Sequence, residues 1–416
     1  MANEEIVSRS QSENLHAYVE YMVANYPLSY IKERAMEAET PLEVLELLAK
    51  HDSPKVRRAV IENSKVSAEI LTMLSEDTDI DVVYAALKHP KMPIEILRKN
   101  SHSLNFFVQL AVSANDSTPE DVLKDMATIY PFTDEPLKGV LVNIISNKNA
   151  TPEILHMISE SKDEDVLLTL APSERILVET LDRLADSEFH DVLIEVACNP
   201  KTTTEILEKL MKKQNNELYG YICTNDNATA DMIRTIYNAY LSDECEEGEI
   251  ELDDIANNPN TPSDVLELLT KSGDDYIRES VAKHKNTSHE TLRRLARNEF
   301  YPIRRNVAQN ANTSSDILAK LAKDNDYNIR SIVAAHGNTS IKTLKKLSKD
   351  NVKYVRREVA ANPNTPIDIL RKLSKDGYSS VRCAVAKNPN TPCDVLEKLS
   401  EDDYSIVCDA AANRLS

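Results

Sequence analysis

The chain has 416 residues, a formal net charge of −19 and 6 glycines, far below the usual share of about 7%. So few glycines nearly exclude sites built on them, such as phosphate-binding loops, dinucleotide-binding turns and nucleophile elbows. With 41% hydrophobic and 28% charged residues, the composition argues against both a disordered chain and a membrane-spanning one. The polar start and six cysteines without paired spacing favour a cytoplasmic protein with reduced thiols.

Residues 1–39 precede the first clean repeat of the chain. Their apolar spacing predicts two helices, over residues 13–25 and 28–38. We interpret residues 1–39 as an N-terminal helical cap, because a stack of repeats needs a terminal element to cover its open end.

From Thr40 onward the sequence repeats itself in 14 units. Eleven of the 13 steps between units are 26 residues long, and the other two, of 32 and 33 residues, place insertions near 125–149 and 241–254. The fifth residue after each anchor is leucine in 13 of the 14 units, which confirms the register. The anchors are Thr40, Val66, Met92, Thr118, Ala150, Ile176, Thr202, Ala228, Thr261, Thr287, Thr313, Thr339, Thr365 and Thr391.

Each anchor is predicted to cap the first helix of its repeat. A threonine there would accept a backbone N–H, and the proline that often follows suits the first helical position. An acidic residue three positions on would complete a capping box, and only Lys342 breaks that set. The first helix should bury one apolar stripe, as at Val265, Leu266 and Leu269.

A short polar turn leads to a second helix, which should bury Val355, Val359 and Ala360 in the repeat that begins at Thr339. It should end at Asn-Pro, with the asparagine in the left-handed conformation that glycine usually takes. One helix pair cannot bury its own apolar face, so neighbouring pairs must stack. The sequence therefore predicts an all-α, right-handed α-solenoid of about 14 two-helix repeats, forming one continuous domain over residues 40–416.

The motif of these repeats resembles the variant leucine-rich repeat proteins, and its Asp-then-Val-Arg part resembles HEAT repeats generally. The resemblance covers residues 40–416 and implies a helical repeat architecture, with a second helix longer than the 3₁₀ turn of that family. The residues that carry it are Asn362-Pro363-Asn364-Thr365-Pro366-Ile367-Asp368-Ile369-Leu370, then Val381-Arg382 and Val385-Ala386.

Founding members of the variant family carry an N-terminal iron–sulfur cluster held by cysteines. The first cysteine here is Cys198, so that cluster has no ligands in this sequence. Cys383, Cys393 and Cys408 lie in adjacent repeats, but their spacing matches no metal-binding pattern. We expect no metal and no cofactor.

An arginine recurs 17 residues after the anchor in six repeats. One interpretation is a basic stripe for phosphates. The helical angle instead places the arginine between buried positions, which favours a structural Asp–Arg ladder with the aspartate six residues earlier. The expected pairs are Asp324 with Arg330, Asp350 with Arg356 and Asp376 with Arg382; the other arginines of the set are Arg57, Arg278 and Arg304.

Three groups of residues are candidates for binding a partner. The first is the arginines that follow the ladder positions, the second is the acidic residues of the later insertion, and the third is two aromatic residues of the earlier insertion. Solvated loops with no binding role are the alternative for both insertions. The candidates are Arg58, Arg305 and Arg357, then Asp243, Glu244, Glu246 and Glu247, then Tyr130 and Phe132.

The preferred function is a non-enzymatic scaffold for protein–protein interaction, since the nine histidines are scattered and form no catalytic motif. The expected partner is a protein or peptide, with a basic surface toward the acidic N-terminal half; residues 261–416 carry +6 and the rest −25. The alternative is a nucleic-acid-binding or DNA-glycosylase-like HEAT-repeat protein that uses the basic C-terminal half. A third hypothesis is self-association through an uncapped C-terminal edge that exposes Val407 and Ala411.

Overall fold

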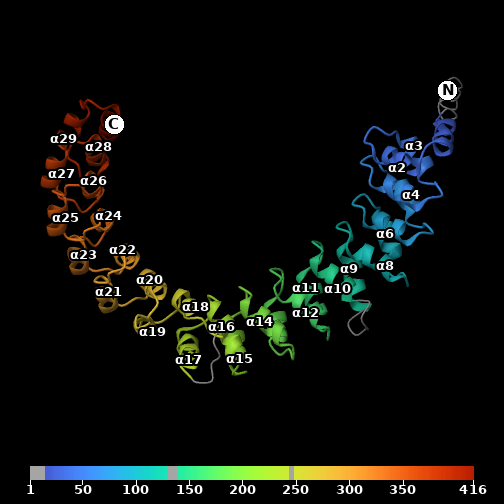
Figure 1. Ribbon diagram of the computed structural model, residues 1–416, viewed down its shortest axis with the longest axis horizontal. Helices are drawn as coiled ribbons and strands as arrows, with labels where there is room; N and C mark the ends of the chain where they lie inside the picture. The colour runs from blue at the N-terminus through green and yellow to red at the C-terminus, as the bar shows by residue number, and fades with distance from the viewer. Residues whose placement is uncertain (1–14, 130–137, 243–247) are drawn as a thin grey trace. The chain divides into compact units, whose positions relative to one another are not determined.

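The computed structural model describes residues 15–129, 138–242 and 248–416, and all regular structure in these ranges is helical (Figure 1). The chain divides into two compact units, an N-terminal unit of residues 1–206 and a C-terminal unit of residues 207–416. Among the residues described, no helix has both the length and the apolar character that crossing a membrane requires.

The N-terminal unit begins with a helix over residues 15–25, in agreement with the first helix expected from the sequence. The helices that follow it are α2 (Leu28–Met36), α3 (Leu42–Leu48), α4 (Pro54–Ile61), α5 (Ala68–Leu74), α6 (Ile80–Lys88), α7 (Ile94–Asn100), α8 (Phe106–Ser113), α9 (Glu120–Ile129), α10 (Lys138–Ser146), α11 (Pro152–Ile158), α12 (Glu164–Leu170), α13 (Val178–Leu184) and α14 (His190–Cys198).

The boundary between the units falls within α15 (Thr204–Met211). The helices of the C-terminal unit are α16 (Asn216–Thr224), α17 (Ala230–Tyr240), α18 (Leu252–Asn257), α19 (Ser263–Leu269), α20 (Asp275–Lys283), α21 (His289–Leu295), α22 (Tyr301–Gln309), α23 (Ser315–Leu321), α24 (Tyr327–Ala335), α25 (Ile341–Leu347), α26 (Lys353–Ala361), α27 (Ile367–Leu373), α28 (Ser379–Lys387), α29 (Cys393–Leu399) and α30 (Ser405–Leu415).

Within the C-terminal unit the helices form two rows (Figure 1). The first helices of the repeats, α21, α23, α25, α27 and α29, make one row, and the second helices, α22, α24, α26, α28 and α30, make the other. Each second helix packs against the second helix of the next repeat, and each first helix packs against the second helix of its own repeat. This sequential packing is that of an α-solenoid.

The apolar positions expected from the repeat form the core. Val265, Leu266 and Leu269 are buried on α19, and Val355, Val359 and Ala360 are fully buried on α26. Repeating the same burial from helix pair to helix pair makes the core continuous along each unit, and the expectation for these positions is confirmed.

The C-terminal edge differs from the expectation. Val407 and Ala411 are both fully buried rather than exposed, because α30 runs for 11 residues and packs on α28 and α29. The large apolar side chains that α30 does expose are Ile406 and Leu415. The expected exposure of Val407 and Ala411 is therefore wrong, whereas self-association through this edge stays a prediction.

The anchor threonines act as hydrogen-bond donors, not as helix caps. Thr365 is buried and its hydroxyl donates to the carbonyl of Val359, 2.5 Å away in the preceding helix. The residue after the anchor is the N-cap, as with Pro366 in α27 or with Ser340, whose hydroxyl accepts the N–H of Thr343. The acid expected at the third helical position therefore lies at the second, so the predicted capping box does not form, although the acid still faces the positive end of the helix.

The asparagine at the end of the second helix, present in nine of the 14 repeats, does not adopt the left-handed backbone conformation, and His89, His284 and His336 replace it in three others. Asn362 has φ −66° and ψ 125°. Its side chain closes the turn instead: the amide donates to the carbonyls of Ala334 and His336 in the preceding repeat, and its oxygen accepts the N–H of Asn364. The same arrangement recurs at Asn63, Asn115, Asn147, Asn258, Asn310 and Asn388.

The extra residues of the two long repeats lengthen their first helices. Helix α9 has 10 residues and α17 has 11, compared with seven in most other first helices. The interval 125–149, where the sequence placed an insertion, contains the end of α9 and the whole of α10.

Candidate functional site

The repeated arginine forms a ladder that joins one repeat to the next. The guanidinium of Arg330 donates to both carboxylate oxygens of Asp350, at 2.8 and 3.1 Å, and to the backbone carbonyl of Asp324, at 2.9 Å. The Arg330 side chain is 14% exposed and that of Asp350 is 9% exposed. Because these contacts occupy the guanidinium donors, they support a structural role for the arginine.

The carboxylate partner differs from the expected one. It lies 20 residues after the arginine, in the next repeat, whereas the residue six positions before the arginine contributes its backbone carbonyl. Arg278 is the exception and pairs with Asp275 on its own helix, since the position 20 residues later is Asn298. The pairs that cross between repeats are Arg57–Asp77, Arg304–Asp324, Arg330–Asp350, Arg356–Asp376 and Arg382–Asp402.

The ladder lowers the pKa of its carboxyl groups. Burial alone would raise the pKa of Asp350, but the hydrogen bonds from Arg330 and from the N–H of Val352 outweigh it and leave the pKa below its ordinary value. The same balance lowers the pKa of Asp324 and of Asp376. These aspartates are therefore ionised at neutral pH and are not candidates for general acids.

The three exposed arginines expected to contact a partner are divided between the two units. Arg58 lies in the N-terminal unit, 3.8 Å from Glu62. Arg305 on α22 and Arg357 on α26 both lie in the row of second helices of the C-terminal unit, two repeats apart. Arg357 donates to Glu358, its neighbour in the chain. The structure thus brings two of the three arginines onto one surface.

Exposed tyrosines line the same row near the starts of the second helices. Tyr327, Tyr354, Tyr378 and Tyr404 are between 42% and 56% exposed, and the rings of Tyr327 and Tyr354 stack with centroids 6.2 Å apart. The sequence reasoning missed this row because the tyrosines occupy three neighbouring positions of the repeat and not a single one. Their recurrence two to four residues after the ladder aspartate was the available signal.

Cations lie over most of these rings. The ammonium of Lys353 is 5.3 Å from the centre of the Tyr354 ring and 5.0 Å from that of Tyr378. The guanidinium of Arg357 is 5.7 Å from the Tyr354 ring. Such contacts hold the rings in place while leaving about half of each one open to a ligand.

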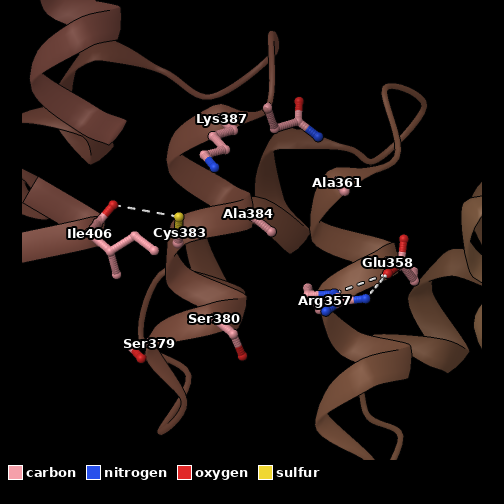
Figure 2. Close-up of a pocket in the computed structure, with 10 residues that line it drawn as sticks. Arg357, Glu358, Ala361, Ser379, Ser380, Cys383, Ala384, Lys387 and Ile406 are labelled. Carbon is pink, nitrogen blue, oxygen red and sulfur yellow. Dashed lines mark hydrogen bonds and ion pairs between the residues drawn. The ribbon is translucent and has the colours of Figure 1, made fainter. Parts of the chain in front are cut away.

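Two depressions of about 540 Å³ each lie between neighbouring second helices. The first is lined by residues of α22, α24 and α26, including Arg305 and Ile332. The second is lined by residues of α26, α28 and α30, including Arg357 and Cys383 (Figure 2). Glu358 lines both, so the depressions are neighbours along one surface.

The lining of the second depression is mainly small or apolar, with charges at its rim. Figure 2 shows Ala361, Ala384 and Ile406 around it, with Arg357 paired to Glu358 at one side. The thiol of Cys383 is turned toward the carbonyl of Ile406, 3.5 Å away. This arrangement suits an apolar side chain flanked by polar contacts.

We name the surface of α22, α24, α26, α28 and α30 that carries the tyrosine row, Arg305, Arg357 and both depressions the tyrosine face. The other candidate residues, Tyr130, Phe132, Asp243, Glu244, Glu246 and Glu247, lie outside the described residues.

The described residues contain no group of three or more His, Cys, Asp or Glu side chains placed to hold a metal ion. The thiols of the described cysteines show no sign of a reactive centre either. Burial raises the pKa of Cys223 to about 12, and the thiol of Cys408 donates to the carbonyl of Asp402. Cys408 thus takes the ladder position of arginine in the last repeat, with a sulfur in place of a guanidinium.

A scan of the sequence against models of protein families finds no match, and no curated protein matches it either. Solved structures of repeat proteins are similar to it. A leucine-rich repeat variant with a novel repetitive structural motif is 19% identical, with a TM-score of 0.29, and the match covers 67% of this chain and 86% of that one. An engineered protein is 17% identical, with a TM-score of 0.19, and the match covers 89% and 97%.

The karyopherin Kap121p, in a structure bound to the extreme C-terminus of the protein phosphatase Cdc14p, is 9% identical with a TM-score of 0.33. That match covers 99% of this chain, which spans about half (52%) of the length of the karyopherin. The first of these structures is of the repeat type that the sequence motif resembles. At these identities and TM-scores, the similarities assign no activity or partner to this chain.

Proposed function

We propose that the protein is a non-catalytic scaffold that binds an extended polypeptide segment of a partner across the tyrosine face. The observation that carries the proposal is the row of half-exposed tyrosines, fixed by cations, beside two neighbouring depressions. Tyrosine and arginine are enriched where proteins bind one another, because each combines a large apolar area with a polar group.

The spacing of the surface fits an extended ligand. Stacked helices lie about 8–10 Å apart, which is roughly the length of three residues of an extended chain. Side chains of a bound segment could therefore enter successive depressions, while its backbone hydrogen-bonds to Arg305, Arg357 or the tyrosine hydroxyls. Depressions of this size accept side chains, and specificity would come from the polar groups at their rims.

Fewer features of this face favour a nucleic-acid ligand, because most of its rings already hold cations and Glu358 borders both depressions with negative charge.

The proposal is tested by selecting peptides from a random display library on the full chain and measuring their binding by fluorescence polarisation. We expect the double variant Tyr354→Ala, Arg357→Ala to weaken the selected peptides by about tenfold or more, the loss typical of an interface centre. The matched control is Tyr276→Ala, which removes an exposed tyrosine of the same repeat position that has no ring or cation contact among the described residues. Equal binding by all three proteins would contradict the proposal.

A further inference from the structure

The first helices of the C-terminal unit carry a second feature, a basic pair at their C-terminal ends that recurs in four successive repeats. The two members are three residues apart, and the backbone N–H of the later one donates to the carbonyl of the earlier one, as from Lys349 to Lys346 at 3.2 Å. Both side chains therefore lie within one helical turn. We name the set the basic strip: Arg294, Arg297, Lys320, Lys323, Lys346, Lys349, Lys372 and Lys375.

All eight side chains of the basic strip are exposed, and most have no acidic partner. Arg294 lies 3.5 Å from Glu267, and Lys372 lies 4.0 Å from Asp368. The other six members form no ion pair with any residue that the structure describes. Four successive repeats thus present cations that no neighbouring carboxylate neutralises.

The charge of this segment is exceptional in an acidic protein. Residues 287–390 contain 20 lysines and arginines against nine acidic residues, a net of +11, whereas the whole chain carries −19. Lysines at the ends of short helices also favour the helix dipole, which would account for some of them. Other repeats show that the fold does not require a basic pair, since two of them have Met73 with Glu76 and Met157 with Glu160 at these positions. Outside the basic strip, Lys209 and Lys212 form one further basic pair, in the repeat that begins at Thr202.

Helix α25 lies in the middle of the basic strip and is its most basic element. Its repeat is the one in which Lys342 replaces the usual acid, and Lys345 adds a further exposed cation that has no ion pair among the described residues. The neighbouring exposed side chains are aliphatic, with Ile341 60% and Ile367 50% exposed. The surface therefore offers positive charge and aliphatic contact together.

We infer that the basic strip is a docking surface for an acidic polypeptide segment that also carries aliphatic side chains. Charge complementarity supplies the attraction, and the exposed isoleucines supply apolar contacts. Single-stranded nucleic acid is disfavoured because its bases need aromatic side chains to stack on, and α21, α23, α25 and α27 contain no phenylalanine, tyrosine or tryptophan. The inference is independent of the tyrosine face, which lies in the other row of helices.

The test measures fluorescence polarisation of a labelled peptide of repeated Glu-Glu-Leu, about 18 residues long so as to span four or more repeats, on the full chain. We expect binding that weakens as salt rises from low to physiological concentration, because exposed charge pairs are screened. The triple variant Lys320→Glu, Lys346→Glu, Lys375→Glu should weaken the peptide by about tenfold or more, through three lost attractions and three new repulsions. A peptide of repeated Gln-Gln-Leu should not bind measurably.

The matched control is Lys148→Glu, Lys213→Glu, Lys285→Glu, which makes the same change in charge at exposed lysines outside the basic strip. An equal loss in both triple variants would show a bulk charge effect and overturn the inference. So would tighter binding of an oligo-dT probe than of the peptide, or salt-dependent self-association of the chain that the strip variant abolishes.

Two further measurements keep the result interpretable. Circular dichroism melting of each variant detects a loss of fold, and the milder change of the same three lysines to glutamine should give a smaller loss of affinity in the same direction. The variant Tyr354→Ala, Arg357→Ala should bind the acidic peptide as tightly as the unchanged protein does. A negative result for the basic strip can then be told apart from a negative result for the tyrosine face.

Discussion

At the scale of single residues, the repeats are held together by side chains that donate hydrogen bonds to backbone carbonyls of neighbouring helices and repeats. In most repeats a buried asparagine at the end of the second helix satisfies two carbonyls of the preceding repeat, as Asn362 does, and an anchor threonine satisfies one carbonyl of its neighbouring second helix, as Thr365 does. Buried backbone groups without partners are costly, so these few side chains determine whether consecutive repeats can stack. They also let the chain turn without glycine.

We expect Asn362→Ala to lower the free energy of unfolding by about 2 kcal/mol, because it leaves the carbonyls of Ala334 and His336 and the N–H of Asn364 without their partner. Urea denaturation followed by circular dichroism measures the change. The control is Asn325→Ala, an exposed asparagine in a turn, which should cost less than about 0.5 kcal/mol. Equal costs would show that the asparagine ladder does not stabilise the stack.

The ladder aspartates make stability depend on pH. In the folded chain the pKa values of these aspartates lie below the ordinary value. Their contribution to the free energy of unfolding is therefore complete at a pH above the pKa of an aspartate in the unfolded chain, about 3.9, and is lost as the pH falls through the lower pKa of the folded chain. We expect the urea midpoint to fall as the pH drops from about 5 to 3. The variant Asp350→Asn, Asp376→Asn should be less stable at neutral pH yet show a shallower fall, and an unchanged slope would contradict this origin.

At the scale of the elements, helices of seven and nine residues are too short to persist alone in water. Each depends on its neighbours in the row, and the Arg–Asp ladder links a second helix to the turn of the next repeat. The ladder should therefore contribute to coupling between repeats and not only to the stability of one helix.

Comparing two arginines isolates that coupling. We expect Arg330→Ala to cost about 2–4 kcal/mol, because it leaves Asp350 buried without its partner in the next repeat. Arg278→Ala should cost about 1 kcal/mol, since its partner Asp275 is 43% exposed and lies on the same helix. The two values come from equilibrium urea unfolding, and a larger cost for Arg278 would refute the ladder as the link between repeats.

Much of the element-scale description was predictable, and the partner of the ladder arginine was not. The 26-residue period located the helices, the buried valines and leucines and the buried arginine. It could not identify the partner of Arg330, because Asp324 and Asp350 occupy the same position of consecutive repeats. The repeat of Arg57 distinguishes the two possible partners. The residue six positions before Arg57 is His51, which has no carboxylate, whereas the residue 20 positions after it is Asp77.

The candidate site was less predictable than the fold. Periodicity shows which residues are equivalent but not which surface they share, so Arg58 was grouped with Arg305 and Arg357 although it lies in the other unit. The tyrosine row escaped because its members shift by one or two positions between repeats, and the depressions depend on the three-dimensional packing of three helices. Neither the tyrosine row nor the depressions correspond to residues at a fixed spacing in the sequence.

At the scale of the whole molecule, charge is segregated along the chain. The N-terminal unit has 19 basic and 36 acidic residues, whereas residues 287–390 carry +11. A scaffold with opposite charges on different repeats can discriminate among partners by charge before close contact is made. The tyrosine face and the basic strip would then be two separate surfaces on the same repeats, one on each row of helices.

Hydrogen–deuterium exchange of the full chain, with and without a peptide selected on it, tests the central proposal most directly, because it reports protection along the whole sequence. We expect slower exchange at the starts of α24, α26 and α28, around Tyr327, Tyr354 and Tyr378, and no change in α23, α25 and α27. Protection confined to those first helices or to the N-terminal unit, or none at all at saturating peptide, would contradict binding at the tyrosine face.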